Sequence, residues 1–247
     1  MMAAFWNKVK KAQDNCRPYC SAIVPAAGTS SRMGGENKLF IPLAGVPVLV
    51  RTLQAIDKAE LVDEIIIATQ ESLLLEVADL CNQANLTKRV RVVRGGATRT
   101  ESVLAAAVEA SPKAQLLAVH DGARPLVRPE EFDEVIRFAC KTYAAAPAVP
   151  VTDTVKVADE NGLVTATPDR SKLFAVQTPQ VFRAEILKAA LQSLVSSGDT
   201  ATDDCAAVER LGKQVYLMGG NRENIKITTP IDIVIAEAIL EQRGQSR

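Results

Sequence analysis

Apolar and polar positions follow two distinct periodic patterns along this chain. Short apolar runs predict buried strands at residues 22–25, 64–69, 90–94, 116–120 and 146–151. Amphipathic stretches of helical length lie between them, at residues 48–58, 72–83, 100–110 and 129–143. Because strands and helices alternate, the pattern predicts an α/β fold: a doubly wound, mostly parallel, twisted sheet with flanking helices.

The alternation of predicted strands and helices is interrupted at residues 152–170. Two β-prone runs, TVKVA and LVTAT, flank residues 159–162, whose last two are Asn161 and Gly162. An Asn-Gly turn between such runs predicts a hairpin, here a protruding β-hairpin arm. An isolated two-stranded ribbon is only marginally stable in water, which favours packing on a partner chain and hence a dimer. The alternative is a surface hairpin packed on its own domain.

Regular elements return after the arm. Residues 172–176 are expected to re-enter the sheet, and residues 215–218 predict a further strand. The remaining helical patterns cover residues 183–195, 203–211 and 230–243, the last being an amphipathic closing helix with Pro230 at its start. We find no internal repeat and no low-complexity linker. The pattern therefore predicts an N-terminal extension over residues 1–20 and one domain over residues 21–247.

Charge and composition narrow the class of partner. Lys and Arg together number 29, as do Asp and Glu, so the chain has no net charge. A neutral chain with 4% aromatic residues does not resemble a nucleic-acid-binding protein, which needs basic patches and stacking platforms. Any anion site must be built from a local cluster of cations. The 47% of hydrophobic residues are enough for a sizeable core.

Cysteine and histidine usage argues against a zinc site and for a reducing compartment. The five cysteines are scattered with no C-x-x-C pair, and there is one histidine. An odd, scattered set indicates the cytoplasm. The first twenty residues lack the apolar stretch of a signal peptide, and no run of about 18 apolar residues predicts a membrane span.

Residues 21–40, SAIVPAAGTSSRMGGENKLF, carry the clearest chemical signal. An apolar run stops at a loop of small residues that is followed by Arg32 and Lys38. Small residues let backbone N–H groups approach an anion, and the two cations add positive charge, which suits a polyphosphate. The loop matches neither the Walker A pattern nor G-x-G-x-x-G. The alternative is an ordinary loop with two surface cations.

Two further loops are expected beside it. Gly28, the pair Gly95-Gly96 and the pair Asp121-Gly122 each follow a predicted strand. Ligands of open α/β sheets bind outside the carboxyl ends of the strands. The three loops should therefore line one crevice.

The ordered motifs PAAGTSSRMGGENKLF, RGGATRTESV, HDGARP, PVTDTVK, PDRSKLFAVQTPQVF, TDDCAAVERLG and NIKITTP carry a resemblance. Together they resemble the cytidylyltransferases that join CTP to 2-C-methyl-D-erythritol 4-phosphate in the non-mevalonate isoprenoid pathway. The resemblance extends over residues 21–240. It implies a Rossmann-like domain, a homodimer built through the β-arm, and CTP and a polyol phosphate as substrates. This chain departs from the family pattern at Ser30 and Asn37, which usually are glycine and proline.

The resemblance also implies roles for individual residues. The catalytic group would be Arg32, Lys38, Lys226 and Asp121, with the three cations on the CTP phosphates. CTP would be held by Pro25, Ala26, Ala27, Gly28, Gly95, Gly96 and Ser102. The acceptor would be bound by Arg124, Thr154, Arg170 and Thr178, with Thr154 and Arg170 reaching into the neighbouring subunit.

Mg²⁺ or another divalent cation is expected to bridge the phosphates, held mainly by the phosphates themselves, with Asp121 as a possible protein ligand. His120 is interpreted as a structural residue at a strand end, and Thr100 as a possible helix N-cap.

The implied reaction does not require a general base. A phosphomonoester has a second pKa of about 6, so it is already a dianionic nucleophile at neutral pH. Two alternatives remain at this point: an acceptor such as ribitol 5-phosphate, and a non-catalytic CTP-binding dimer. The presence of Lys38, Lys226 and Asp121 disfavours the second.

Overall fold

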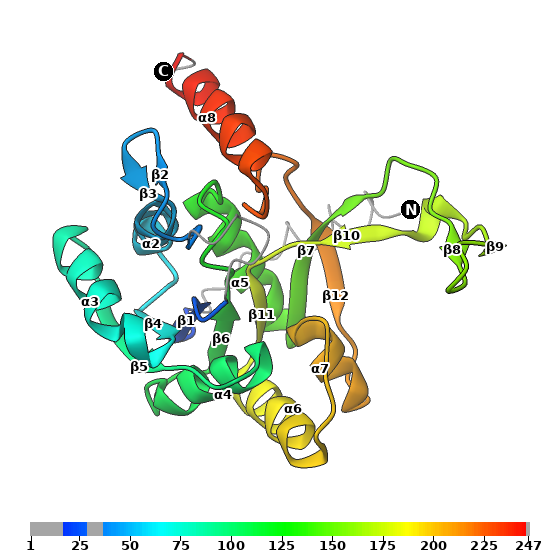
Figure 1. The fold of residues 1–247 in the computed structure, drawn as a ribbon. Coiled ribbons are helices and arrows are strands. Elements are labelled where there is room, and N and C mark those ends of the chain that lie inside the picture. The colour runs from blue at the N-terminus through cyan, green and yellow to red at the C-terminus, as the bar shows by residue number, and fades with distance from the viewer. Residues whose placement is uncertain (1–16, 29–36, 246–247) are drawn as a thin grey trace.

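An eight-stranded sheet forms the middle layer of the computed structural model, which describes residues 17–28 and 37–245 (Figure 1). Neighbouring strands follow the order β10-β7-β11-β6-β1-β4-β5, and β12 also pairs with β7. The strands are β1 (Cys20–Pro25), β4 (Glu64–Thr69), β5 (Arg89–Arg94), β6 (Leu116–Val119), β7 (Ala144–Pro150), β10 (Phe174–Val176), β11 (Gln180–Arg183) and β12 (Tyr216–Gly219). All seven strands expected from the sequence are present among them, which confirms the α/β class.

The half of the sheet from β5 to β6 is parallel. In register, Ala22 lies opposite Ile65 of β4 and Ala118 of β6. Every residue of β4 and β6 is buried, because helices cover both faces. Successive residues of β1 point to opposite faces, so Ala22 and Val24 join one core and Ile23 joins the other.

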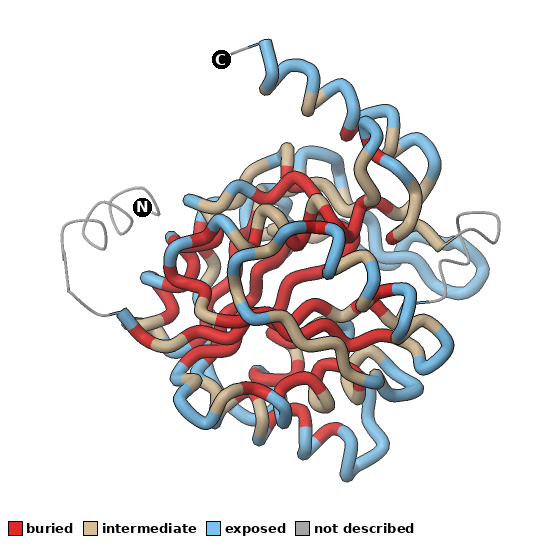
Figure 2. The backbone as a smooth tube through the Cα atoms, turned by 90° about the vertical axis from the view of Figure 1, so that its left-hand side faces the viewer, coloured by how far each residue is buried: buried red, intermediate tan, exposed pale blue. Residues whose placement is uncertain are grey.

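Two helical layers enclose this sheet. The first core includes side chains of α2 (Val48–Lys58), α3 (Leu74–Gln83) and α5 (Pro129–Thr142). The second is formed with α4 (Arg99–Glu109), α6 (Ala184–Ser197) and α7 (Asp204–Arg210). Figure 2 shows the buried residues gathered along the strands between these layers.

The sequence pattern missed β11, and this strand changes the sheet. It runs antiparallel between β6 and β7, and β10 is antiparallel at the edge beside β7. The run Gln180–Arg183 has four residues, which is too short for periodicity to separate it from the helix that follows it directly. The sheet is therefore parallel on one side and mixed on the other.

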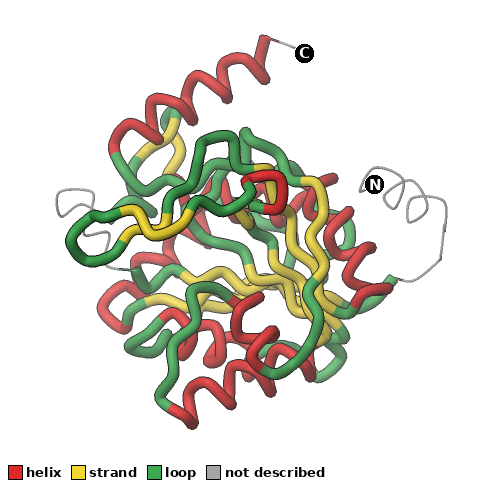
Figure 3. Tube along the Cα trace, turned by 90° about the vertical axis from the view of Figure 1, so that its right-hand side faces the viewer, coloured by secondary structure: helices red, strands yellow, loops and turns green. Residues whose placement is uncertain are grey.

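The arm is present as a hairpin of β8 (Val157–Ala158) and β9 (Val164–Ala166). The Asp159 carboxylate accepts bonds from the backbone N–H groups of Asn161 and Leu163, and Gly162 has φ of 82°. The hairpin projects from the domain in two views (Figures 1 and 3). Leu163 is 68% exposed and Val164 is 50% exposed, so the arm does not bury its apolar side chains on its own domain.

The closing helix α8 (Pro230–Gln245) forms as expected, but it is not a simple amphipathic helix. Ala236 is buried, and Ile233, Ile239 and Leu240 pack against the core. Ile231, Val234 and Ile235 are exposed on its other sides. A small hairpin of β2 (Pro42–Leu43) and β3 (Val46–Pro47) lies beside the middle of α8, where the Ala44 N–H donates to Glu237.

None of the helices in the described ranges is long and apolar enough to cross a lipid bilayer.

The N-terminus of α4 is closed by a capping box at Thr98, not by Thr100. The Thr98 hydroxyl accepts from the Glu101 N–H, and the Glu101 carboxylate accepts from the Thr98 N–H. Thr100 lies inside the helix, two residues further on. The cap fixes the turn that leads from the Gly95-Gly96 loop into α4.

We expect Thr98→Ala to lower the free energy of unfolding by about 1 kcal/mol, because one backbone N–H loses its side-chain acceptor. Thr100→Ala, the matched control, should not destabilise the protein, because alanine favours the helix interior. Urea unfolding followed by circular dichroism measures both values. Equal losses in the two variants would contradict the assignment of the cap.

Candidate functional site

A cavity of about 320 Å³ opens at the carboxyl ends of β1, β5 and β6. It is the crevice that the three strand-ending loops predict. Its lining contains Pro25, Ala26, Ala27, Gly28, Lys38, Leu39, Gly96, Ala97, Thr98, Arg99, Ser102, Asp121, Gly122, Ala123 and Lys226. Nine of the residues predicted to take part in catalysis or substrate binding line this cavity. Gly95 is next to the lining, and Arg32 lies outside the described residues.

Backbone and side-chain bonds fix the loop after β1. The Ala26 N–H donates to the Ala68 carbonyl at 2.7 Å, which extends the β1–β4 pairing beyond the strand. The Gln70 amide donates to the Ala27 carbonyl at 2.8 Å. The loop therefore enters the cavity with its path set by the neighbouring strand, and Lys38 joins the lining on the far side of residues 29–36.

The loop after β5 is narrow because it contains two glycines. A Cβ on Gly95 would lie 2.8 Å from the Ser102 Oγ, and a Cβ on Gly96 would collide with Glu101. The Ser102 hydroxyl accepts from the Gly96 N–H at 3.1 Å and donates to the Thr98 carbonyl at 2.8 Å. Ser102 thus shapes the loop, and the wall it supports is largely backbone. Such a wall can approach a flat ligand closely.

Asp121 lies at the centre of the site and is surrounded by cations. Its Oδ2 is 3.0 Å from Lys226 Nζ and 3.4 Å from Arg124 Nε. Its Oδ1 is 3.7 Å from Arg99 Nη2. The residue is only 8% exposed. Burial alone would raise the pKa of this carboxyl, but Lys226, Arg99 and Arg124 together hold the pKa far below its usual range.

Two of these cations are anchored a second time. Arg124 Nη1 donates to the Asn224 carbonyl at 2.7 Å, and Arg99 Nη2 donates to Asp204 Oδ2 at 2.7 Å. Asp204 is 1% exposed, and burial raises its pKa despite the opposing effect of Arg99. Asp121, Arg99 and Asp204 thus form a continuous ionic chain from the cavity to helix α7.

Sequence reasoning missed Arg99. The sequence pattern starts this helix at residue 100 and so leaves Arg99 in a loop, whereas in the structure Arg99 is the first residue of α4. The positive end of the helix dipole disfavours a cation there, so an arginine at that position suggests a partner elsewhere in the fold.

Behind Asp121 the wall is polar and buried. The Asp121 N–H donates to the Thr178 hydroxyl at 3.1 Å, and this hydroxyl also bonds His120 Nδ1 at 3.0 Å. His120 Nε2 lies 3.2 Å from the Arg124 carbonyl. His120 is fully buried, which agrees with the structural role expected from its position. Thr178 is 3% exposed and its hydroxyl positions Asp121, while its assignment to the acceptor stays a prediction.

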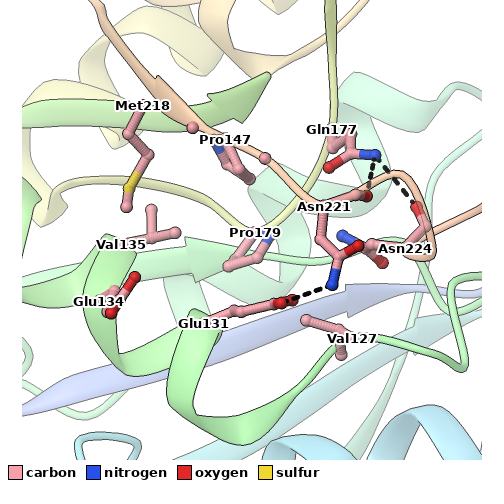
Figure 4. Close-up of a pocket in the computed structure, with 12 residues that line it drawn as sticks. Val127, Glu131, Glu134, Val135, Pro147, Gln177, Pro179, Met218, Asn221 and Asn224 are labelled. Atoms are coloured by element: carbon pink, nitrogen blue, oxygen red, sulfur yellow. Dashed lines mark hydrogen bonds between the residues drawn. The ribbon is translucent and has the colours of Figure 1, made fainter. Parts of the chain in front are cut away.

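The segment that precedes Lys226 lines a second cavity, of about 140 Å³, and is held there by hydrogen bonds (Figure 4). There the Gln177 amide donates to the carbonyls of Asn221 and Asn224, at 2.8 and 3.4 Å. The Asn221 amide donates to Glu131 at 2.6 Å. On the cavity side, the Ile227 N–H donates to the Ala123 carbonyl at 2.8 Å. These bonds set Lys226 opposite Asp121.

The structure does not bring the arm residues to this cavity. Thr154 and Arg170 are exposed, and Arg170 Nη1 donates to the Thr152 carbonyl at the base of the arm, at 2.9 Å. Neither residue lines the cavity of its own chain.

In chemical terms, the cavity combines cations with close backbone. Lys38, Arg99 and Lys226 line it, Arg124 stands just behind Asp121, and Asp121 is the acid among them. Within the described ranges no three His, Cys, Asp or Glu side chains gather as a metal cluster. This arrangement suits a polyanionic ligand better than a resident metal ion.

Comparison with known proteins gives a consistent result. A sequence profile of the 2-C-methyl-D-erythritol 4-phosphate cytidylyltransferase family matches residues 20–242. Proteins of that name from Symbiobacterium thermophilum and Desulforamulus reducens are each 43% identical to this chain. The matches cover 91% and 90% of this chain and 94% and 96% of the relatives.

Solved structures agree with the sequence comparison. A 4-diphosphocytidyl-2C-methyl-D-erythritol synthase from Anaerococcus prevotii has a TM-score of 0.82 at 31% identity, covering 91% of this chain and 97% of its own. A 2-C-methyl-D-erythritol 4-phosphate cytidylyltransferase from Thermus thermophilus has a TM-score of 0.74 at 32% identity, covering 90% and 98%.

His120 lies in the buried polar wall behind Asp121, and NMR spectroscopy can test whether its ring is neutral there. Burial lowers the pKa of His120 to about 4, against the opposing effects of its bonded partners. Since the unfolded value is about 6.5, the unfolded chain binds the extra proton first, and this group's contribution to stability is lost as the pH falls from about 6.5 to about 4. The single imidazole signal in NMR should not titrate between pH 8 and 5. A midpoint near 6.5 would contradict the buried, neutral ring.

Proposed function

The chain belongs to the 2-C-methyl-D-erythritol 4-phosphate cytidylyltransferase family and is a nucleotidyltransferase. We propose how the residues of its cavity carry out the cytidylyl transfer. The enzyme transfers the cytidylyl group of CTP to 2-C-methyl-D-erythritol 4-phosphate and releases pyrophosphate. The main support for this function is the cavity at the carboxyl ends of β1, β5 and β6, where an ionised Asp121 is surrounded by cations.

CTP would bind with its base against the second loop and its phosphates among the cations. The backbone wall at Gly96 and Ser102 leaves room for a flat ring, and a pyrimidine fits a narrower slot than a purine. Lys38 and Lys226 face the same cavity from opposite ends of the chain. Arg32 is assigned to the triphosphate by resemblance alone.

The proposed chemistry is an in-line displacement. The acceptor phosphate attacks the α-phosphorus of CTP, the new P–O bond forms as the bond to the β-phosphate oxygen breaks, and pyrophosphate leaves. Both reactants are polyanions, so the rate depends on positioning and charge neutralisation by Lys38 and Lys226. A nucleophilic side chain of the protein is not needed, because the phosphate dianion attacks directly.

Mg²⁺ fits this site as an ion carried in by the nucleotide. Asp121 supplies one ionised carboxylate, and the described residues provide no cluster of further acidic ligands. Mg²⁺ commonly binds through one or two carboxylates and the substrate phosphates. Bound there, it would neutralise charge on the phosphates during transfer.

The arm supports a dimeric site. Its apolar side chains Val157, Leu163 and Val164 are exposed, and a ribbon of this size needs a partner to be stable. Thr154 and Arg170 are exposed on it and do not reach their own chain's cavity. We therefore assign both to the acceptor phosphate bound in the neighbouring subunit. Arg124, 12% exposed at its side chain, is assigned to the acceptor from the same chain as Asp121.

The described cysteines, Cys20, Cys81, Cys140 and Cys205, form no disulfide with one another, which supports the cytoplasm as the compartment.

The direct test is turnover by the unmodified protein. With CTP and Mg²⁺, we expect pyrophosphate release in the presence of 2-C-methyl-D-erythritol 4-phosphate and much less with ribitol 5-phosphate or with no acceptor. A coupled pyrophosphate assay measures all three rates. A higher kcat/KM for ribitol 5-phosphate would reassign the acceptor, and CTP binding without turnover would indicate a binding protein.

Subunit mixing tests the shared site. Arg170→Ala and Lys226→Ala should each lower turnover by at least about a hundredfold, the scale of losing one preorganised charge contact. Mixed dimers of the two variants would contain one site with Lys226 from one chain and Arg170 from the other. Partial recovery of activity after subunit exchange is therefore expected. Proven mixed dimers without recovery would place both residues in one chain's site.

A further inference from the structure

We propose that Arg99 is a positioning residue for the reaction, which holds Asp121 in place and thereby frees Lys226 to bind the nucleotide. This inference rests on the proposed function and adds to it a residue that acts through Asp121. It starts from the ionic chain Asp121–Arg99–Asp204, whose distances are 3.7 and 2.7 Å.

The three cations around Asp121 differ in how firmly they are held. Arg124 is fixed by the Asn224 carbonyl and Arg99 by Asp204, each at 2.7 Å. Within the described part of the chain, the Lys226 ammonium is paired with Asp121 alone, and its side chain is 39% exposed. A lysine stem is flexible, so Lys226 is the cation that can leave the carboxylate for a phosphate.

Moving Lys226 away from the Asp121 carboxylate has an electrostatic cost, and Arg99 reduces that cost. Asp121 is nearly buried, so its charge must stay compensated when Lys226 turns to the nucleotide. Arg99 faces Oδ1, whereas Lys226 and Arg124 are paired with Oδ2. With Arg99 present, one partner remains on each oxygen after Lys226 leaves. Without it, Oδ1 is unpaired and the carboxylate holds Lys226 more strongly.

The carboxylate that anchors Arg99, that of Asp204, is itself held in a bonded network. The Asp204 N–H and Cys205 N–H both donate to Gln180 Oε1 at 3.1 Å, and the Gln180 amide donates to Asp203 at 2.8 Å. Asp203 in turn caps helix α7 by accepting from the Ala206 N–H. The guanidinium is thus held by a carboxylate that is itself fixed between β11 and α7. Such support is what keeps a functional group within a fraction of an ångström.

A binding cycle tests this mechanism without relying on turnover. CTP affinity, measured by calorimetry with no acceptor and no Mg²⁺ present so that only protein cations face Asp121, should fall by about tenfold or more in Arg99→Ala, in line with losing one charge-assisted contact. In the Lys226→Ala background the same Arg99→Ala change should cost less than about twofold, because there is no lysine left to free. Arg210→Ala, which removes an exposed ion pair on α7, is the matched control and should not change affinity.

Equal losses in the two backgrounds would overturn the proposal, because they would mean that Arg99 contacts or attracts the nucleotide independently of Lys226. Arg99→Lys should recover affinity only partly, since a flexible lysine stem does not hold its charge in a fixed plane as a guanidinium does. If Arg99→Ala fails to fold because Asp204 is left as a buried unpaired charge, the double variant Arg99→Met with Asp204→Asn removes both partners and is measured in its place.

A crystal structure of the Arg99 variant separates this inference from the proposed function. We expect the Asp121 carboxylate to rotate toward Lys226, whatever substrate the enzyme uses. An unmoved carboxylate would overturn the inference while leaving the cytidylyltransferase assignment intact. Absence of CTP turnover in the unmodified protein would do the reverse.

Discussion

A single buried negative charge organises this site. Asp121 can remain ionised in a nearly solvent-free position only because Lys226, Arg124 and Arg99 surround it. Each of those cations comes from a different part of the chain, so the carboxylate requires three segments to converge. The backbone bond from Ile227 to Ala123, the Thr178 hydroxyl on the Asp121 N–H, and the anchoring of Arg99 on α7 all serve that convergence.

The same arrangement explains how a neutral protein binds a highly charged ligand. The chain as a whole has equal numbers of acidic and basic residues, so no long-range attraction supports binding. Positive potential is instead concentrated in one cavity by pairing the cations with a carboxylate at the back and leaving Lys226 partly exposed at the front. The acidic partner keeps the cations close together in the absence of ligand, where they would otherwise repel one another.

Most of the fold was predictable because it depends on local periodicity. Buried runs such as Glu64–Thr69 and the Gly-rich strand ends identify the parallel half and its ligand edge directly from the chain. Short-range patterns did not show β11, whose place depends on pairing with β6 and β7. For the same reason Lys38, Asp121 and Lys226 were predictable from motifs, whereas Arg99, Gln177 and the bonding of Thr178 depend on contacts between residues distant in sequence. Whether Arg170 acts in a partner subunit remains a prediction.

The antiparallel direction of β11 has a consequence for how the molecule can vary. In a purely parallel sheet, each strand contributes to the ligand edge only the residues that leave it. Because β11 runs the other way, the residues entering it, Gln177 and Thr178, arrive at that edge and contact Asp121 and Asn224 from behind. Residues that enter the sheet and residues that leave it therefore both contribute to the edge where the ligand binds. A substitution at Gln177 or Thr178 would therefore act on Asp121 and Asn224 through these contacts, although neither residue follows a parallel strand.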